Sequence, residues 1–397
     1  MKKYYGEETR KALDNFHMTN TPVDLRLIKA VAIVKLAAIK ANVKTGKIKR
    51  ELGRPIIKAA KEVIDGKLDT QFPTDQIQGG AGTSINMNVN EVITSRANEI
   101  LGSSSIHYLD HVNSSQSTND VIPTAIRIVI LEELGKYLIS LNKLSITFAK
   151  KEKEFCNIVK VGRTHLQDAV PITLGREFGA YKNLIKRDIK RLEEIKKYLL
   201  ITNLGGTAIG TSENASKDYI TAIHEYLEME TGYKFTPSHD LVDATQNIDP
   251  LIHASYLIQL SSVGISKICS DLRLLASGPR AGLAEILLPS YQKGSSIMPG
   301  KTNPVILEAF NQVTYQVIGN TQVATQVILA GELELNTMLP VFSKTIIESL
   351  TFLTNGINSV NDTVSTIKAN SEKIQSNLDT SLVLSTQLSK FIGYDRA

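Results

Sequence analysis

The fold of this 397-residue chain is decided by residues 346–367, IIESLTFLTNGINSVNDTVSTI. The apolar residues of this segment follow one another at spacings of three and four, at Ile346, Leu350, Leu353, Ile357, Val360, Val364 and Ile367. Because an α-helix turns once in about 3.6 residues, this spacing places them all on one face of a long helix. Such a stripe needs burial, so the segment predicts a helix that packs lengthwise against others.

Four more segments predict long helices. The same spacing recurs within residues 130–148 and 178–199, and residues 251–276 and 305–329 are apolar around much of the helix. A helix that is apolar on several sides is buried on several sides. The five segments together predict an all-α fold with a long-helix bundle. Their apolar surface exceeds what one five-helix bundle needs, which favours burial against neighbouring subunits.

Composition excludes several classes of protein. Hydrophobic residues make up 42% and charged residues 21%, as in ordinary soluble domains. We expect no membrane partner because no apolar run reaches the roughly 18 residues of a membrane span. The net charge of +5 is spread along the chain without a basic stripe interleaved with aromatics, so we expect no nucleic-acid partner.

Cysteine usage and the N-terminus point to the cytoplasm. Cys156 and Cys269 form neither a metal-binding pattern nor a disulfide framework, and both lie in helix-like sequence. We therefore predict two free, buried thiols in a reducing compartment. The first residues lack the apolar stretch of a secretion signal, which also favours a cytoplasmic location.

A polar loop is predicted between the long helices at 251–276 and 305–329, at Gly294-Ser295-Ser296-Ile297-Met298-Pro299-Gly300-Lys301-Thr302-Asn303-Pro304. Lys301 can hold a carboxylate, and Asn303 can donate or accept a hydrogen bond beside it. A serine such as Ser295 can act as a base if backbone N–H groups and nearby positive charge stabilise its alkoxide. Composition alone leaves an ordinary surface loop equally open.

A second polar stretch lies before the predicted helix that begins near Val121. Asn119 and Asp120 are good N-cap residues, and capping alone is one interpretation. The other is binding, because a helix N-terminus presents free N–H groups and a partial positive charge that suit a carboxylate. Ser117 and Thr118 would add hydroxyl donors there.

Four motifs, in this order, resemble those of the fumarase/aspartase superfamily. They are GTSINMN at 82–88, SQSTND at 115–120, GRTHLQD at 162–168, and the loop at 294–304. The resemblance runs from about Tyr5 to the last residue, and it implies the all-α long-helix bundle of that superfamily. It also implies a homotetramer with shared active sites. Superfamily members eliminate a group beta to a carboxylate and release fumarate or a fumaryl product.

The resemblance assigns roles to individual residues. Ser295 matches the proposed base, and the positions that match substrate-binding residues are Thr83, Ser117, Thr118, Asn119, Thr164, His165, Ser296, Met298, Lys301 and Asn303. Some members are proposed to use the histidine as an acid or charge relay, whereas we expect His165 to bind substrate. Asn86 and Asn88 are expected to brace their loop. Neither a metal site nor any cofactor is implied, and His107 and His111 have no further ligand cluster nearby.

Details within the motifs favour the aspartase members. Thr118 stands where fumarases often carry serine, and GGTAIGT at 205–211 and DLRLLASGPRAGL at 271–283 also read like aspartases. Departures occur at 108–110, at Thr302 and at Leu339. The resemblance thus implies a small dicarboxylate substrate and reversible elimination of ammonia from L-aspartate, through a C3 carbanion formed by a serine base. The alternatives are fumarase-type hydration of fumarate to malate and a catalytically silent helical scaffold.

The order of these segments predicts three parts. They are a small N-terminal helical domain at 1–112, the central bundle at 113–368, and the start of a shortened C-terminal domain at 369–397. Relatives in the superfamily carry a small domain after the bundle, and this chain ends where that domain would be beginning. We therefore expect the C-terminal domain to be truncated or missing.

Overall fold

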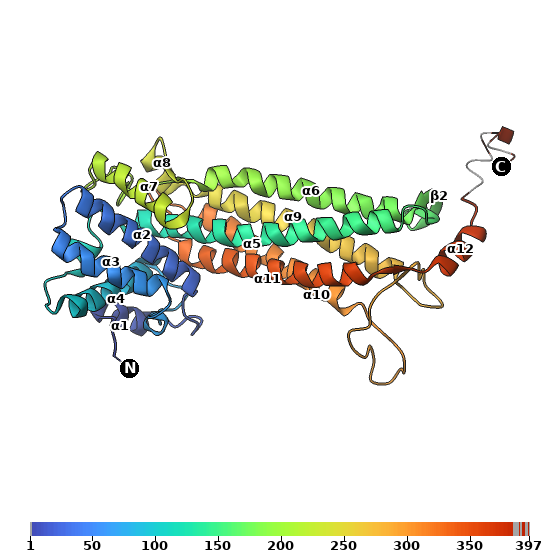
Figure 1. Ribbon diagram of the computed structural model, residues 1–397, viewed down its shortest axis with the longest axis horizontal. Coiled ribbons are helices and arrows are strands. Elements are labelled where there is room, and N and C mark those ends of the chain that lie inside the picture. Colours follow the sequence, from blue (N-terminus) through green and yellow to red (C-terminus); the bar gives the residue numbers. More distant parts are fainter. Residues whose placement is uncertain (1, 384–388, 390, 394–395, 397) are drawn as a thin grey trace. The chain divides into compact units, whose positions relative to one another are not determined.

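The computed structural model describes residues 2–383, 389, 391–393 and 396, and over this part it is mainly helical (Figure 1). The chain forms two compact units. Unit 1 comprises Met1–Leu134, Glu194–Tyr256 and Gly319–Ser349, and unit 2 comprises Gly135–Glu193, Leu257–Ile318 and Leu350–Ala397. Each passage between units falls inside a long helix, namely α5 (Thr118–Glu154), α6 (Leu174–Leu199), α9 (Asp249–Leu275), α10 (Val305–Leu329) or α11 (Leu339–Thr366).

The five long helices confirm the five predicted segments. Helix α10 has the predicted bounds, and α9 is shifted by one or two residues from 251–276. In α11 and the residue that follows it, the apolar stripe is buried, with Leu350, Leu353, Ile357, Val360, Val364 and Ile367 at 0% exposure and Ile346 at 2%. The all-α fold class is therefore confirmed.

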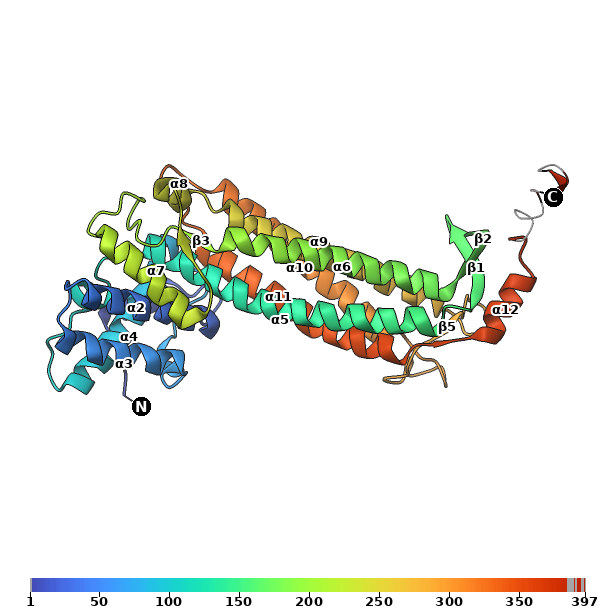
Figure 2. The ribbon, with the colours of Figure 1, turned by 45° about the horizontal axis from the view of Figure 1, so that its top comes forward.

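In unit 2 the five helices run side by side (Figures 1 and 2). Phe148 of α5 packs on Phe178 and Tyr181 of α6, with ring centroids 5.8 and 5.7 Å apart. Helices α10 and α11 approach closely at Gly356, where a Cβ would lie 2.9 Å from the ring of Phe310. Interlocking of this kind fills the space between helices at the density of a protein interior.

Unit 1 carries the shorter helices α1 (Glu7–Asn15), α2 (Leu25–Lys44), α3 (Arg50–Ile64), α4 (Thr83–Leu101), α7 (Lys217–Thr231) and α8 (Leu241–Gln246). Helix α2 packs against α3 and α7, while α4 packs against α1 and α3. The carboxylate of Glu91 in α4 accepts backbone N–H groups from Gly6, Glu8 and Thr9 at 2.9, 2.8 and 3.1 Å. These bonds hold the start of α1 to α4.

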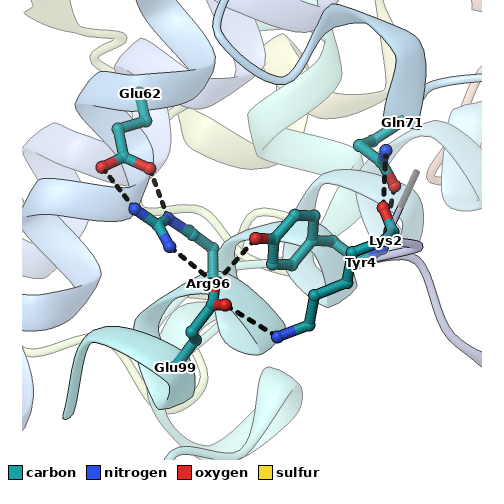
Figure 3. A network of polar contacts seen from close by, with 6 residues as sticks. All are labelled: Lys2, Tyr4, Glu62, Gln71, Arg96 and Glu99. Carbon is teal, nitrogen blue, oxygen red and sulfur yellow. Dashed lines mark hydrogen bonds and ion pairs between the residues drawn. The ribbon is translucent and has the colours of Figure 1, made fainter. Parts of the chain in front are cut away.

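A network of charged and polar groups fixes the residues before α1 (Figure 3). Arg96 forms a two-pronged contact with Glu62, and Glu99 accepts from Arg96, from Lys2 at 2.7 Å and from the Tyr4 hydroxyl at 2.7 Å. Three donors lower the pKa of the Glu99 carboxyl to about 2, with Lys2 contributing most. The N-terminal segment is thereby tied to α3 and α4.

Three pairs of short strands complete the described part of the chain. Strands β1 (Val159–Thr164) and β2 (Gln167–Thr173) form an antiparallel hairpin, β3 (Ile201–Thr202) pairs with β4 (Thr236–Pro237) in parallel, and β5 (Ile286–Leu287) pairs with β6 (Lys368–Ala369). Short helical turns lie at Asp69–Gln71, Gly80–Gly82 and Tyr108–Val112, and α12 spans Ser371–Asp379. The sequence did not predict the β1–β2 hairpin.

The prediction for the cysteines is half wrong. Cys269 is buried in α9, but Cys156 is exposed and lies in the turn after α5 rather than in a helix. Where the structure describes the chain, no helix is both long and apolar enough to cross a membrane. The division of the chain into three parts at residues 112 and 368 stays a prediction. Several residues of the predicted C-terminal part lie outside the described residues, namely 384–388, 390, 394, 395 and 397.

Candidate active site

Thr83 is the first residue of α4, in unit 1. The turn before it uses the left-handed backbone region, with φ of 56° at Ala81 and 91° at Gly82. A Cβ on Gly82 would lie 3.2 Å from Ile122, so a glycine lets this turn rest against the first turns of α5. Thr83 is exposed, and its hydroxyl donates to the Gly80 carbonyl at 2.7 Å.

Helix α5 begins three residues earlier than the sequence predicted. Its first residue is Thr118, and Ser117 rather than Asn119 or Asp120 is the N-cap. The Ser117 hydroxyl accepts the N–H of Asn119 at 3.2 Å, and Asp120 accepts the N–H of Ser117 at 2.9 Å. This reciprocal arrangement is a capping box, which satisfies two N–H groups and so extends the helix toward its start.

Asp120 also anchors the start of α5 to a neighbouring loop. The side chain is fully buried, and its second oxygen accepts the N–H groups of Gly205 and Thr207 at 3.1 and 3.0 Å. Burial raises the pKa of the carboxyl to about 6, although the backbone donors and the cation of Lys35 oppose this rise. Burial likewise lowers the pKa of the Lys35 ammonium to about 7, opposed by Asp120.

Two predicted binding residues of α5 make internal hydrogen bonds. Asn119 donates its amide to the carbonyl of Ala208 at 2.7 Å. The hydroxyl oxygen of Thr118, a residue only 9% exposed, accepts the amide of Asn86 at 3.1 Å. Asn86 and Asn88 do brace this region, since Asn88 donates to the Gln71 carbonyl at 3.1 Å.

Unit 1 therefore brings together four of the predicted site residues, Thr83, Ser117, Thr118 and Asn119, at the first turns of α4 and α5. We call these four residues the helix-terminus cluster. Two helix N-termini add their partial positive charge at this place, and hydroxyl groups surround them. The arrangement suits a carboxylate ligand.

Thr164 and His165 lie in unit 2, at the tip of the β1–β2 hairpin. Thr164 pairs with Gln167, and the two residues between them, His165 and Leu166, have φ of 55° and 62°. Two consecutive left-handed residues form the two-residue turn that matches the twist of a hairpin. The helix that follows the hairpin, α6, begins at Leu174. Both Thr164 and His165 are exposed.

The remaining predicted residues belong to the loop between β5 and α10, also in unit 2. The N–H of Gly294 donates to the carbonyl of Lys301 at 2.8 Å, and the amide of Asn303 donates to the carbonyl of Gly294 at 2.9 Å. A Cβ on Gly294 would lie 2.6 Å from the Lys301 carbonyl oxygen, so this closure needs a glycine. Figure 1 shows the loop standing clear of the helices of unit 2.

Within this loop Ser295 accepts two backbone N–H groups. Its hydroxyl oxygen lies 3.2 Å from the nitrogen of Ile297 and 3.1 Å from that of Met298. Ser296 and Met298 are exposed, and the N–H of Met298 points to Ser295. Lys301 and Asn303 line a cavity of about 610 Å³ together with Arg273 and Pro304, the residue before α10.

A buried ion cluster joins the hairpin to the segment that leads into this loop. The carboxylate of Glu285, a residue at 0% exposure, forms ion pairs with the guanidinium of Arg163 at 2.9 Å and the ammonium of Lys160 at 3.0 Å. Both cations lie on β1, and Glu285 directly precedes β5. Glu177 lies 3.5 Å from Lys160, and its pKa is raised by burial. The cluster fixes the base of the hairpin that carries Thr164 and His165.

The predicted site residues thus form three groups: the helix-terminus cluster in unit 1, and the hairpin tip and the loop in unit 2. Sequence reasoning missed Asp120 and Glu285 as anchors. Asp120 lies in the SQSTND motif and could have been recognised as the partner of a capping box, whereas Glu285 carries no local signal. No group of three metal-ligating side chains occurs among the residues that the structure describes.

Comparisons with known proteins show the family of the chain. A family model described as "Lyase" matches residues 1–319. The chain is 46% identical to a Bacillus sp protein named aspartate ammonia-lyase, in an alignment that covers 99% of this chain and 86% of that protein. A fumarate lyase:delta crystallin from Brucella melitensis, solved bound to cobalt, has a TM-score of 0.97 and 42% identity, over 100% of this chain and 88% of that one.

A recombinant class II fumarase from Schistosoma mansoni is similar to the same extent in structure. Its TM-score is 0.97 at 35% identity, over 100% of this chain and 88% of that one. The family model and these likenesses each span most of the chain. The chain therefore belongs to this lyase family, the fumarase/aspartase superfamily whose four motifs it carries.

Proposed function

We propose that this chain catalyses the reversible elimination of ammonia from L-aspartate to give fumarate. The observation that carries the reaction is the 46% identity, over 99% of the chain, to a relative named for it. The test is the ultraviolet absorbance of fumarate, with aspartate, malate and argininosuccinate offered in parallel. We expect fumarate from aspartate.

The same assay separates the other candidates. The likeness to a class II fumarase favours hydration of fumarate to malate as a second candidate. Fumarate formed from malate and not from aspartate would replace ammonia elimination by that reaction. No product from any substrate would indicate a silent helical scaffold.

Ser295 is the proposed base. The C3 proton of aspartate is weakly acidic because the neighbouring carboxylate is already negative, so its removal needs a strong base. The two N–H groups that reach the Ser295 oxygen would stabilise an alkoxide there, which lowers the pKa of the hydroxyl. A backbone hydrogen bond from Gly294 to Lys301 closes the loop that carries Ser295.

The remaining residues would bind the charges that the reaction develops. Proton transfer to Ser295 leaves an electron pair that spreads into the adjacent carboxylate as a doubly charged aci-carboxylate. Thr83, Ser117, Thr118, Asn119 and Ser296, with the backbone near Met298, are the proposed donors to the substrate, and Lys301 and Asn303 are proposed to hold the second carboxylate. Thr164 and His165 would complete the binding site. The C2–N bond then breaks, ammonia leaves and fumarate forms, with no cofactor required.

We further propose a homotetramer in which each active site takes residues from more than one subunit. Thr118 opens α5, and the hairpin with Thr164 follows its end. The two residues belong to different units of the chain, and the four motifs are widely separated along the sequence. This separation supports sites that are drawn from more than one subunit.

Exposed apolar residues support assembly. In unit 2 the long helices expose large hydrophobic side chains at Ile139, Ile146, Leu260, Val263, Leu274, Tyr315 and Phe352. Leu260, Val263 and Leu274 fall on one face of α9, since they are separated by three and eleven residues. An apolar stripe of this kind on a monomer marks a protein interface.

Mixing two inactive variants tests the composite site. Ser295→Ala and Thr118→Val chains are each expected to be nearly inactive. Co-refolded in equal amounts, they should regain about a quarter of the activity if each site takes the two residues from different subunits. No recovery, or an active monomer by light scattering, would contradict shared sites. The cytoplasm is the proposed location, on the basis of two unpaired thiols.

A further inference from the structure

Beneath the helix-terminus cluster, one side-chain oxygen accepts three hydrogen bonds. The side-chain oxygen of Asn113 receives the ammonium of Lys35 at 2.8 Å and the amides of Asn86 and Asn90 at 3.2 Å each. Lys35 and Asn90 are 0% exposed and Asn86 is 1% exposed. All of these residues belong to unit 1.

Lys35 determines which way the neighbouring amides face. Below its pKa of about 7, Lys35 is an ammonium group that can only donate, so the Asn113 atom that faces it has to be the oxygen. Asn86 then has to present its nitrogen to that oxygen, because its own oxygen there would face another acceptor. The second N–H of the same nitrogen points to the Thr118 hydroxyl oxygen at 3.1 Å.

This orientation of the Asn86 amide leaves its oxygen without a hydrogen bond from the described part of the chain. The two bonds that its nitrogen donates therefore determine how the amide is oriented. The side-chain oxygen of Asn86 is buried and accepts no hydrogen bond from the residues that the structure describes. Such an orphaned acceptor typically costs about 1–3 kcal/mol. A reversed amide would place this oxygen against the Asn113 oxygen, which has no proton to donate.

The orientation of the Asn86 amide determines how the Thr118 hydroxyl can form hydrogen bonds. Its hydroxyl oxygen already accepts from Asn86, and it donates to no acceptor among the described residues. The hydroxyl proton therefore remains available for a ligand at the N-terminus of α5, where the partial charge of the helix favours an anion. Hydrogen bonds to an ionised acceptor are stronger than those between neutral groups.

We propose that Asn86 is a positioning residue which, held by Lys35 through Asn113, makes the Thr118 hydroxyl a dedicated hydrogen-bond donor to a substrate carboxylate. This rests on the proposed function in so far as Thr118 binds substrate. Asn86 itself touches no substrate, and acts by fixing the direction of one hydrogen bond.

A double-mutant cycle on ligand binding tests the proposal without requiring turnover. The probe is succinate, a dicarboxylate that lacks the amino group, titrated calorimetrically into the full-length protein. Thr118→Val should weaken succinate binding roughly tenfold, the effect of losing one hydrogen bond to a charged group. Asn86→Leu should weaken it by a similar factor.

The decisive result is the double variant. If Asn86 acts through Thr118, the two losses do not multiply, and Asn86→Leu with Thr118→Val should again bind about tenfold more weakly. A loss near a hundredfold would show that Asn86 acts independently, and unchanged binding by Asn86→Leu would also overturn the proposal. Unchanged succinate binding by Thr118→Val would show that Thr118 does not bind the carboxylate, and would overturn the proposal. Ammonia elimination would still be tested separately by the fumarate assay.

Asn88→Leu is the matched control. Asn88 lies two residues further along α4, is 0% exposed and donates its amide to the Gln71 carbonyl rather than toward Thr118. Its replacement should cost comparable stability but leave succinate binding within about twofold, because no bond leads from it to the ligand. Equal loss of binding in Asn86→Leu and Asn88→Leu would indicate a general packing effect and overturn the proposal.

A conservative pair keeps the test decisive if Asn86→Leu does not fold. Asn113→Asp preserves the acceptor that faces Lys35, so succinate binding should stay within about threefold of the unchanged protein, whereas Asn113→Leu should lose about tenfold. Equal losses in the two variants would contradict the orienting role of Asn113.

Discussion

Replacing Glu285 by alanine is expected to destabilise unit 2 and loosen the hairpin that carries Thr164. Glu285 is fully buried, and its removal leaves Lys160, at 2% exposure, and Arg163, at 15%, without their shared carboxylate. Breaking a buried ion pair by removing one partner typically costs about 3–5 kcal/mol. Lys160 keeps Glu177 at 3.5 Å, so we expect the lower end, about 3 kcal/mol.

The assay is thermal unfolding together with hydrogen exchange of the hairpin amides. For a unit of this size, about 3 kcal/mol corresponds to a fall in Tm of about 6–12 °C. Glu285→Gln keeps an acceptor for Arg163 and should lose about half as much. The control is Asp362→Ala, whose ion pair with Lys143 spans 3.9 Å between side chains that are 71% and 60% exposed. Its Tm should change by less than about 2 °C.

Equal unfolding temperatures for Glu285→Ala and Asp362→Ala would refute the reasoning. Unchanged exchange of the β1 and β2 amides in Glu285→Ala would refute it in a second way. The cluster would then contribute neither to the stability of unit 2 nor to the placement of the hairpin.

Three further outcomes are expected. Lys2, Tyr4 and Arg96 lower the pKa of Glu99 to about 2, so the anchoring of the N-terminal segment should be complete above about pH 4.3 and lost as pH falls toward 2. Amide protection of that segment, measured from pH 5 to 2, should fall in this window, and Glu99→Gln should lack it at pH 7. Without ligand, residues 291–302 should exchange faster than the helices of unit 2, because most of them are exposed; equal rates would contradict a mobile loop. Turnover should survive EDTA, and a loss that zinc or magnesium restores would contradict a cofactor-free mechanism.

The long helices could be predicted because their signal is local and repeated. In α11 the apolar positions alone identify the buried face, and α10 has the bounds that its apolar run indicates. A helix of this length carries several turns of the same pattern, so a single exception does not change the outcome. The type of each element follows from such repetition. Which helices pack against one another does not follow from it.

The ends of elements and the small strands depend on single contacts. The start of α5 is set by the exchange of hydrogen bonds between Ser117 and Asp120, which a pattern of apolar residues does not show. The β1–β2 turn uses His165 and Leu166 in place of the Asn-Gly pair that usually signals a hairpin. Cys156 is exposed because the chain turns just after α5, although its neighbours read as helical.

The residues of the candidate site could be predicted from motifs, whereas the contacts that hold these residues in place could not. Ser295, Lys301 and Asn303 lie in one short loop, so their proximity follows from the sequence. The orienting contact of Asn86 with Thr118 joins residues from two helices, and Glu285 meets Arg163 across more than a hundred residues of chain. Contacts of this kind depend on tertiary packing, which periodicity and spacing do not encode.

The central claim is that the Ser295 oxygen removes the C3 proton of aspartate, and the turnover of Ser295→Ala tests it most directly. Loss of a general base costs about 10²–10⁴-fold in kcat, and the account predicts a loss at least that large with a smaller change in KM. Lys301→Ala should differ, with KM raised as well as kcat lowered, because the ammonium holds a carboxylate in both ground and transition states. Near-normal turnover of aspartate by Ser295→Ala would contradict the account at its central step.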